Sequence, residues 1–369
     1  MRDLIPELTA WWDSGEPFAL ATVVDVKGSA PRQPGASMAV SAGGEVVGSV
    51  SGGCVEGAVY ELGAEVLRTR VPVLQTYGIS DDDAFAVGLT CGGVLDILVR
   101  PIDTAAGSEF TDVAASIAGE EPVALATIIA GSDAVAAQVA VWPDRVMGSL
   151  GAEGLDVAVV DDARGMLAQG QTGIRHYGSH GERRQDEVAV FIESFNPPPL
   201  MLVFGAIDFA AAVARIGKYL GYRVTVCDAR PIFATERRFP EADEVVCEWP
   251  HRFLANMPVD ERTVIAVLTH DPKFDVPLLE VALRTPAGYI GAMGSRRTHD
   301  DRLARLRELG FSDTDLERLR SPIGLDLGAR TPEETAVSVA AEIIGLRWGG
   351  SGRPLTSTEG AIHGEPARR

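Results

Sequence analysis

Residues 200–210 read LMLVFGAIDFA, and this stretch decides the fold of the second half of the chain. Its first five residues form an uninterrupted apolar run, which is typical of a strand covered on both faces of a parallel sheet. Gly205 follows at once, and the residues after it predict a helix over 210–220. A strand, a glycine turn and a helix in this order predict the opening of a doubly wound nucleotide-binding sheet.

The residues downstream alternate strand and helix, as a parallel α/β sheet requires. Further strands are predicted at 223–227, 244–247, 264–268 and 288–290. A last helix is predicted to begin after Thr331, because Pro332 and Glu334 complete the pattern of N-cap, first helical position and capping box. We therefore expect a Rossmann-like doubly wound domain over residues 199–348, followed by a disordered tail over 349–369 that has no apolar period.

An internal repeat lies upstream of this domain. Residues 17–26 read PFALATVVDV and residues 122–131 read PVALATIIAG; residues 46–50 and 76–78 have matching segments at 146–150 and 176–178. Each copy predicts a strand, a strand pair, a helix and two further strands. The repeat predicts an N-terminal α/β domain over residues 1–195, built from two similar half-modules at about 17–102 and 122–195, with the prolines at 197–199 as a stiff linker.

The two copies differ in their loops. The first copy contains GSAPRQPG at 28–35, SGGC at 51–54 and a long segment from Asp81 that ends in TCGG at 90–93. The second copy has the plain segments GSDAVAAQ, GAEGL and SHGERR in their places. Since one copy can fold without the elaborated loops, we expect these loops to carry function on a rigid support.

The segment Gly52-Gly53-Cys54 falls between a predicted strand and a helix that begins near Val55. Glycines there let backbone N–H groups approach an anion, and the helix N-terminus favours the thiolate form of Cys54. The alternative is a tight turn in which Cys54 is a small buried hydrophobe. A second glycine-bracketed cysteine, Cys91, favours function, because soft thiolates can hold sulfur, molybdenum or a dithiolene group.

Other candidate ligand groups lie in loops and at strand ends. Arg32 is suited to bidentate contact with an anion, the alternative being an exposed arginine of a surface loop. Asp228 ends the second strand of the Rossmann-like domain, where a ribose contact would lie. His270 follows the fourth strand, and Arg296 belongs to the GAMGSRR segment after the fifth, at the sheet edge where such folds bind ligands. The alternatives are a capping or core imidazole and a solvated helix start.

The glycine fingerprint itself is incomplete. Ile207 replaces the second glycine, which would let the backbone approach a pyrophosphate, and Asp208 would lie beside that phosphate. These two residues count against ordinary NAD(P) binding and leave the fold prediction intact.

Composition excludes several kinds of partner. The 369 residues carry a formal net charge of −19 and only three lysines, Lys27, Lys218 and Lys273, which argues against nucleic acid and anionic membranes. So acidic a surface serves solubility, or docks a basic patch of a protein partner. Three features predict a cytoplasmic protein with no membrane span. The four cysteines are scattered, the sequence lacks a signal-peptide pattern, and it lacks a run of about 20 consecutive apolar residues.

Several motifs together resemble a known family. They are residues 28–32, 34–36, 51–56 and 88–93 in the first half, and residues 269–271 with Asp275, 289–291, 294–297 and 322–329 in the second. In these the sequence resembles the xanthine dehydrogenase accessory factor family, also called XdhC/CoxI. The resemblance implies a protein that binds molybdenum cofactor (molybdopterin), protects it during sulfuration by a cysteine desulfurase, and delivers it to a molybdenum hydroxylase client. It also implies a C-terminal Rossmann domain. The stretch GAIDFA departs from the family's GAGHVA-like sequence.

The leading interpretation is a cofactor chaperone and not a turnover enzyme. The expected cofactor-binding residues are Ser29, Arg32, Ser51, Gly52, Gly53, Cys54, Glu56, Cys91, Gly92, Gly205, Asp228, His270, Asp271, Gly294, Ser295, Arg296 and Arg297. Cys54 and Cys91 are the expected molybdenum or sulfur contacts, and the loops of the first copy are expected to enclose the pterin together with the carboxyl edge of the Rossmann-like sheet. Alternatives are an NAD(P)-dependent oxidoreductase, a thiol-based sulfur-transfer enzyme and a docking protein without a ligand. The identity of the client, the nucleotide form of the cofactor and a homodimer are left open.

Overall fold

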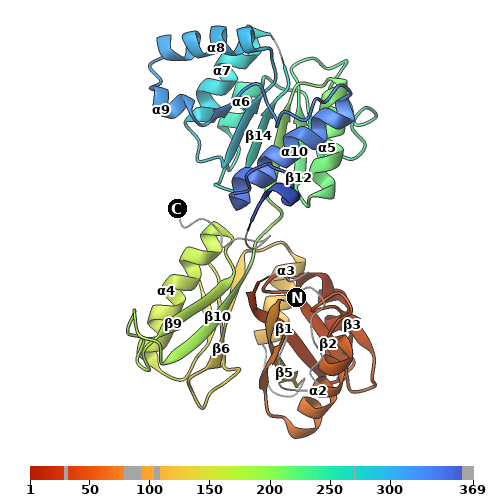
Figure 1. Ribbon diagram of the computed structural model, residues 1–369, viewed down its shortest axis with the longest axis vertical. Coiled ribbons are helices and arrows are strands. Elements are labelled where there is room, and N and C mark those ends of the chain that lie inside the picture. Colours follow the sequence, from red (N-terminus) through yellow and green to blue (C-terminus); the bar gives the residue numbers. More distant parts are fainter. Residues whose placement is uncertain (29–31, 79–92, 104–108, 270, 360–369) are drawn as a thin grey trace. The chain divides into compact units, whose positions relative to one another are not determined.

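The computed structural model describes residues 1–28, 32–78, 93–103, 109–269 and 271–359. The chain divides into two compact units, Met1–Pro197 and Pro198–Glu359 (Figure 1). Over these described residues, no helix combines the length and the apolar content needed to cross a bilayer.

The first unit contains two five-stranded antiparallel sheets with the same strand order. One sheet has the order β3-β2-β1-β5-β4 and the other the order β8-β7-β6-β10-β9. The strands are β1 (Phe18–Lys27), β2 (Ser37–Ser41), β3 (Val46–Gly48), β4 (Val73–Tyr77), β5 (Val94–Ile102), β6 (Val123–Ala130), β7 (Gln138–Val141), β8 (Val146–Gly148), β9 (Gly173–Tyr177) and β10 (Val188–Phe195). The predicted pair of α/β half-modules is confirmed.

Each half-module begins with a helix that the sequence repeat does not reveal. These are α1 (Ile5–Asp13) before β1 and α3 (Glu109–Ala118) before β6. The two helices pack into one core, in which Leu8 and Trp11 of α1 join Val113 and Ile117 of α3. The repeated unit is therefore longer than its matching letters indicate, because the two helices share an apolar face and not a sequence.

A second helix of each half-module covers the outer face of its sheet. The helix α2 (Glu56–Thr69) packs on the first sheet, and α4 (Glu153–Gln169) packs on the second (Figure 1). The inner faces of the two sheets meet, where Leu98 packs with Phe191. The strands β1 and β6 are thus buried on both faces, which explains their continuous apolar sequences.

Opposite charges occupy equivalent positions on the inner faces. Arg100 lies opposite Leu20 in the register of β5 and β1, and Glu193 lies opposite Leu125 in the register of β10 and β6. Burial lowers the pKa of Arg100 to about 10, against the opposing effect of the Glu193 charge. Burial likewise raises the pKa of Glu193. A half-module facing a copy of itself would bring like charges together, so this arrangement favours pairing of the first half-module with the second.

The second unit is a six-stranded parallel sheet with the order β13-β12-β11-β14-β15-β16. The strands are β11 (Leu200–Phe204), β12 (Arg223–Cys227), β13 (Glu244–Val246), β14 (Val264–Val267), β15 (Tyr289–Ala292) and β16 (Leu319–Arg320). The predicted Rossmann-like fold is confirmed, and β16 adds a sixth strand too short to be recognised from sequence. The strand order reverses between β11 and β14, which is where sheets of this kind bind ligands.

Helices cover both faces of this sheet. One face is covered by α5 (Asp208–Tyr219) and α10 (Pro332–Trp348), and the other by α6 (Pro250–Ala255), α7 (Pro272–Leu283), α8 (Arg296–Glu308) and α9 (Asp313–Leu316) (Figure 1). The helix α10 begins with the predicted capping box between Thr331 and Glu334. Residues 349–359 are described and include a short 3-10 helix, Leu355–Ser357, whereas the rest of the tail lies outside the described residues.

Candidate functional site

The loop between β3 and α2 folds around one carboxylate. Glu56 Oε1 accepts hydrogen bonds from the Ser49 hydroxyl at 2.7 Å and from the Ser51 amide at 2.9 Å. Glu56 Oε2 accepts from the Ser51 hydroxyl at 2.5 Å and from the Gly53 amide at 2.8 Å. Burial by itself would raise the pKa of Glu56, but the hydrogen bonds from Ser51 and Ser49 outweigh it and lower the pKa to about 2. Glu56 is therefore ionised at neutral pH.

Three further amides of this loop are bonded to its own hydroxyl groups. The Ser51 hydroxyl accepts from the amides of Cys54 at 2.9 Å and Val55 at 3.0 Å, and the Ser49 hydroxyl accepts from the Gly52 amide at 3.0 Å. The sequence interpretation that these N–H groups cradle an external anion is corrected here, since their partners are side chains of the loop itself. What the loop holds in place is Cys54, which is half-buried against the core beneath α2.

The second half-module repeats the carboxylate without the thiol. Asp156, the counterpart of Glu56, accepts from the Ser149 hydroxyl at 2.6 Å and from the Leu150 amide at 2.7 Å. The counterpart of Cys54 is Gly154, where a Cβ would clash with the carbonyl oxygen of His180. The carboxylate therefore belongs to the shared scaffold, and the cysteine is particular to the first half-module.

Other predicted residues of the first unit are placed only in part. Arg32 is exposed. Ser29, Cys91 and Gly92 lie outside the described residues. The structure thus brings Ser51, Gly52, Gly53, Cys54 and Glu56 into one loop.

Gly205 lies at the switch point of the parallel sheet. It has φ +107°, and a Cβ on it would lie 2.7 Å from Thr269 Cγ2 and 2.9 Å from the Thr269 nitrogen. The turn after β11 therefore packs against the end of β14 in a way that only glycine permits. Ile207, the N-cap residue of α5, packs against the core of the unit, so the position of the second fingerprint glycine is filled by an apolar side chain.

The carboxylate of Asp228 accepts hydrogen bonds from neighbouring groups of the chain itself. It accepts from the Ala206 amide at 2.7 Å, from the Arg230 amide at 2.9 Å, and from Arg230 Nε and Nη2 at 2.9 and 2.8 Å. Burial by itself would raise the pKa of Asp228, but these hydrogen bonds, from Arg230 first, lower it. Arg230 also lies 4.5 Å from the ring centre of Phe233. A ribose at this position would have to displace Arg230.

Two predicted residues of the sheet edge are helix caps. The Ser295 hydroxyl accepts from the Thr298 amide at 3.1 Å at the start of α8, and Asp271 accepts from the Lys273 amide at 3.1 Å at the start of α7. Arg296 and Arg297 are exposed in the first turn of α8, directly after Gly294 and Ser295. His270 lies outside the described residues.

A buried ion pair beneath this edge was missed by sequence reasoning. Arg302 Nη2 lies 2.8 Å from Asp275 Oδ2, and the guanidinium also donates to the Met293 carbonyl and the Ser321 hydroxyl, each at 3.0 Å. The Thr269 hydroxyl donates to Asp275 Oδ1. The residues that follow β14, β15 and β16 are thus tied to one charge pair. The only sequence signal for Arg302 is its position four residues before the buried Leu306, on the same face of α8.

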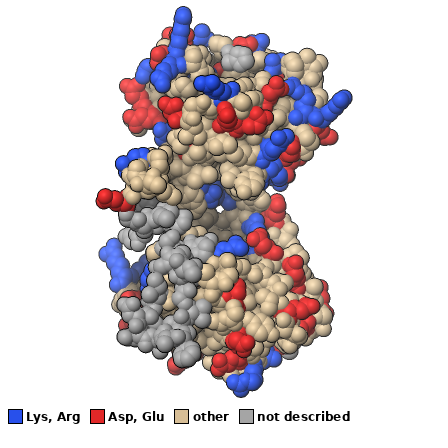
Figure 2. Space-filling model, turned by 45° about the vertical axis from the view of Figure 1, so that its right-hand side comes forward, with Lys and Arg blue, Asp and Glu red and all other residues tan. Residues whose placement is uncertain are grey.

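Charged side chains of both signs mix on the surface. Figure 2 shows basic and acidic side chains interspersed over the visible face of the second unit. In the part of the chain that the structure describes, no group of three or more His, Cys, Asp or Glu side chains is placed to hold a metal ion.

Comparison with known families covers both units. Residues 11–78 and 116–178, one segment in each half-module, match the family model described as the XdhC and CoxI family. Residues 201–343 match the model of the XdhC Rossmann domain. The chain belongs to the XdhC and CoxI family.

Known proteins align with this chain over most of its length. A Bacillus subtilis (strain 168) protein, named as a probable subunit of xanthine dehydrogenase, is 27% identical over 348 residues, which is 92% of this chain and 96% of that protein. The molybdenum cofactor insertion chaperone PaoD of Escherichia coli (strain K12) is 25% identical over 334 residues, 90% of this chain and 85% of PaoD. A crystal structure from Bacillus halodurans described as a xanthine dehydrogenase shares the fold, with a TM-score of 0.71, 24% identity and 97% of each chain covered.

Proposed function

We propose that this protein is a molybdenum cofactor-binding accessory protein that assists insertion of the cofactor into a xanthine-dehydrogenase-type molybdenum hydroxylase. Membership of the XdhC and CoxI family supports a role in cofactor maturation. The relative named as a molybdenum cofactor insertion chaperone, which aligns with 90% of this chain, supports insertion as the step.

The observation that carries the proposal is the difference between the two half-modules at one position. Cys54 lies in a loop whose amides from residues 51 to 55 are bonded to side chains of residues 49–56, whereas its counterpart in the second half-module is Gly154. A thiol fixed at one place by a self-contained loop is suited to contact a soft centre such as molybdenum or its sulfur ligands. We assign Cys54 this contact with the bound cofactor.

The second unit holds a candidate anion site of its own. Arg296 and Arg297 lie exposed in the first turn of α8, where the helix N-terminus adds partial positive charge. Arginine suits the bidentate recognition of phosphate. In this proposal the cofactor remains bound while a cysteine desulfurase sulfurates it, and is then passed to the client hydroxylase.

A nicotinamide-dependent oxidoreductase is a weaker candidate, because the Asp228 carboxylate is already bonded to Arg230 and to the Ala206 amide. A thiol-based sulfur-transfer enzyme would use the same Cys54, and would accumulate a persulfide there after incubation with a desulfurase.

The experiment that tests the proposal mixes the purified full chain with molybdenum cofactor and separates the mixture by gel filtration. Molybdenum and pterin are expected to leave the column together with the protein. Their complete separation from the protein peak would contradict cofactor binding.

A further inference from the structure

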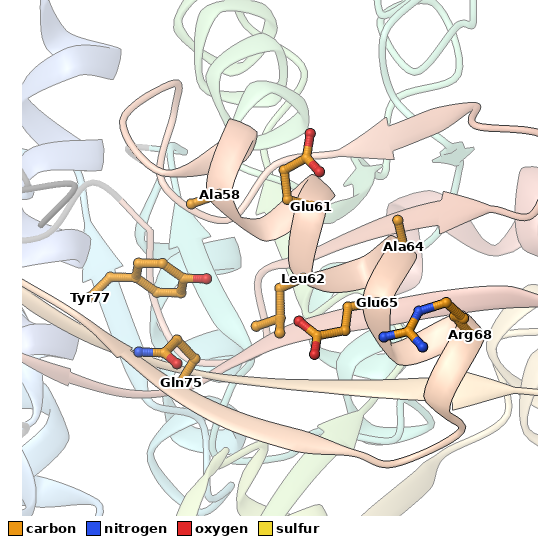
Figure 3. A pocket seen from close by; sticks show the side chains of 8 residues that line it. All are labelled: Ala58, Glu61, Leu62, Ala64, Glu65, Arg68, Gln75 and Tyr77. Atoms are coloured by element: carbon orange, nitrogen blue, oxygen red, sulfur yellow. The ribbon is translucent and has the colours of Figure 1, made fainter. Parts of the chain in front are cut away.

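A groove of about 680 Å³ runs between α2 and β4 of the first half-module. Its lining includes Glu61, Leu62, Glu65, Arg68 and Tyr77. Figure 3 shows the side chains of Leu62, Glu65 and Tyr77 pointing toward one another across this groove.

At the equivalent position of the second half-module, between α4 and β9, lies the chain's own Arg183. Asp161 and Asp162 of α4 are the counterparts of Glu61 and Leu62, and Tyr177 is the counterpart of Tyr77. Arg183 Nη2 lies 2.5 Å from Asp161 Oδ2 and 3.0 Å from Asp162 Oδ1. Arg183 also forms an antiparallel bridge with Tyr177, whose hydroxyl donates to Asp162 at 2.8 Å. The chain after β9 therefore returns beside Tyr177 and places an arginine on the carboxylates of α4.

Arg68 lines the groove from α2, but in the described part of the chain it forms no ion pair with Glu61 or Glu65. The connection from β4 to β5 includes residues 79–92, which contain three aspartates and neither lysine nor arginine. Across the described ranges of the chain, Glu61 and Glu65 take part in no ion pair. Glu61 thus keeps the carboxylate of Asp161 without its cation, and Glu65 adds a carboxylate where the second half-module has Gly165.

We propose that the groove between α2 and β4 binds an arginine-bearing extended segment of a partner protein, in the way that the Arg183 segment occupies the second half-module. The net charge of −19 favours a basic partner segment. Within the described sheet β4 is the terminal strand, so its outer edge can pair with an extended chain. Val71 and Leu74, 58% and 38% exposed, offer apolar contact beside it. This inference does not depend on cofactor binding.

The direct test is fluorescence anisotropy with a capped, labelled peptide Gly-Ser-Arg-Arg-Gln-Gly added to the full chain at about 150 mM salt, where long-range attraction is screened. The peptide is expected to bind with a Kd of about 1 mM or below. The Glu61→Gln/Glu65→Gln variant is expected to raise the Kd about tenfold. The matched control Glu7→Gln/Asp13→Asn makes the same change in net charge at exposed positions of α1, and is expected to leave the Kd within about twofold.

Two further variants use the second half-module as a template. Leu62→Asp installs the counterpart of Asp162, and is expected to tighten binding about threefold by adding a further carboxylate for the guanidinium. Arg183→Ala removes the arginine from Asp161 and Asp162, and is expected to raise the number of bound peptides from one to two.

Three results would overturn the proposal. One is no saturable binding by the unaltered chain. Another is an equal loss of binding in the groove variant and in the α1 control, which would show general charge attraction. The last is unchanged binding after replacement of both peptide arginines by glutamine.

Discussion

Asp275 and Arg302 form an ion pair of 2.8 Å in which each side chain is only 3% exposed. Because Arg302 also binds the Met293 carbonyl and the Ser321 hydroxyl, the pair sets the relative position of three strand ends at the carboxyl edge of the parallel sheet. The exposed arginines that begin α8 follow one of these strand ends. The geometry of this candidate anion site therefore depends on a charge pair that is almost fully buried.

Replacing Asp275 by asparagine should destabilise the second unit strongly. The change leaves a buried guanidinium without its counter-charge, which costs about 3–5 kcal/mol of unfolding free energy. Native-state hydrogen exchange of the amides in β14 and β15 measures the loss in this unit alone. Glu280→Gln, which breaks the exposed pair with Arg284, is the control and should leave exchange nearly unchanged. Equal exchange in both variants would contradict the role given to the buried pair.

Gly205→Ala should displace the turn that opens the Rossmann-like domain. The new Cβ would meet Thr269 in a backbone conformation that also strains alanine, so we expect a loss of at least about 2 kcal/mol in unfolding free energy. Gly221 has φ +82° and open space around its Cβ position, so Gly221→Ala should cost only about 1 kcal/mol. Denaturant unfolding compares the two variants. A cost for Gly205→Ala no larger than that for Gly221→Ala would show that the contact with Thr269 can relax.

Glu56 should stabilise its loop in a pH-dependent way. Its pKa is lowered from the ordinary value of 4.5 to about 2 in the folded protein, so the stabilisation is fully present above the unfolded value and is lost as the pH falls through about 2. Glu56→Gln should cost about 2 kcal/mol at neutral pH, because it removes hydrogen bonds to a charged group. Unfolding measured from pH 7 downward should show the difference between variant and parent shrinking below pH 4.5. A difference that stays constant over this range would mean that Glu56 acts through packing alone.

Titration with NADH and with NADPH should give no saturable signal. The Asp228 carboxylate is bonded to Arg230 and Ala206, and Ile207 fills the place where a glycine would admit the pyrophosphate. Fluorescence of the reduced nicotinamide reports binding directly. Saturation at micromolar dinucleotide would restore the oxidoreductase alternative.

Much of the fold could be predicted because its signals are local. The strands β1 and β6 are buried on both faces, so their apolar runs repeat visibly in the sequence. The capping box at the start of α10 is likewise formed by residues that are close in sequence. The helices α1 and α3 were not predicted, because they share only an apolar face.

The internal bonding of the candidate site could be predicted only in part. The sequence locates the loop of residues 51–56 between a strand and a helix, but the direction of the Glu56 side chain decides that its amides are already bonded. Asp228 and Arg230 are two residues apart, so their pairing could have been suspected. Asp275 and Arg302 are brought together only by the tertiary structure, and no spacing rule connects them.

The most direct test of the central claim, that Cys54 contacts the bound cofactor, is the rate at which the preloaded protein releases molybdenum cofactor. We predict release about tenfold faster from Cys54→Ser than from the parent chain, and also faster release from Cys91→Ser. The control Cys247→Ser changes an exposed cysteine of the second unit and should release the cofactor at the parent rate. Equal release rates for the parent and Cys54→Ser would contradict the claim that this loop holds the cofactor.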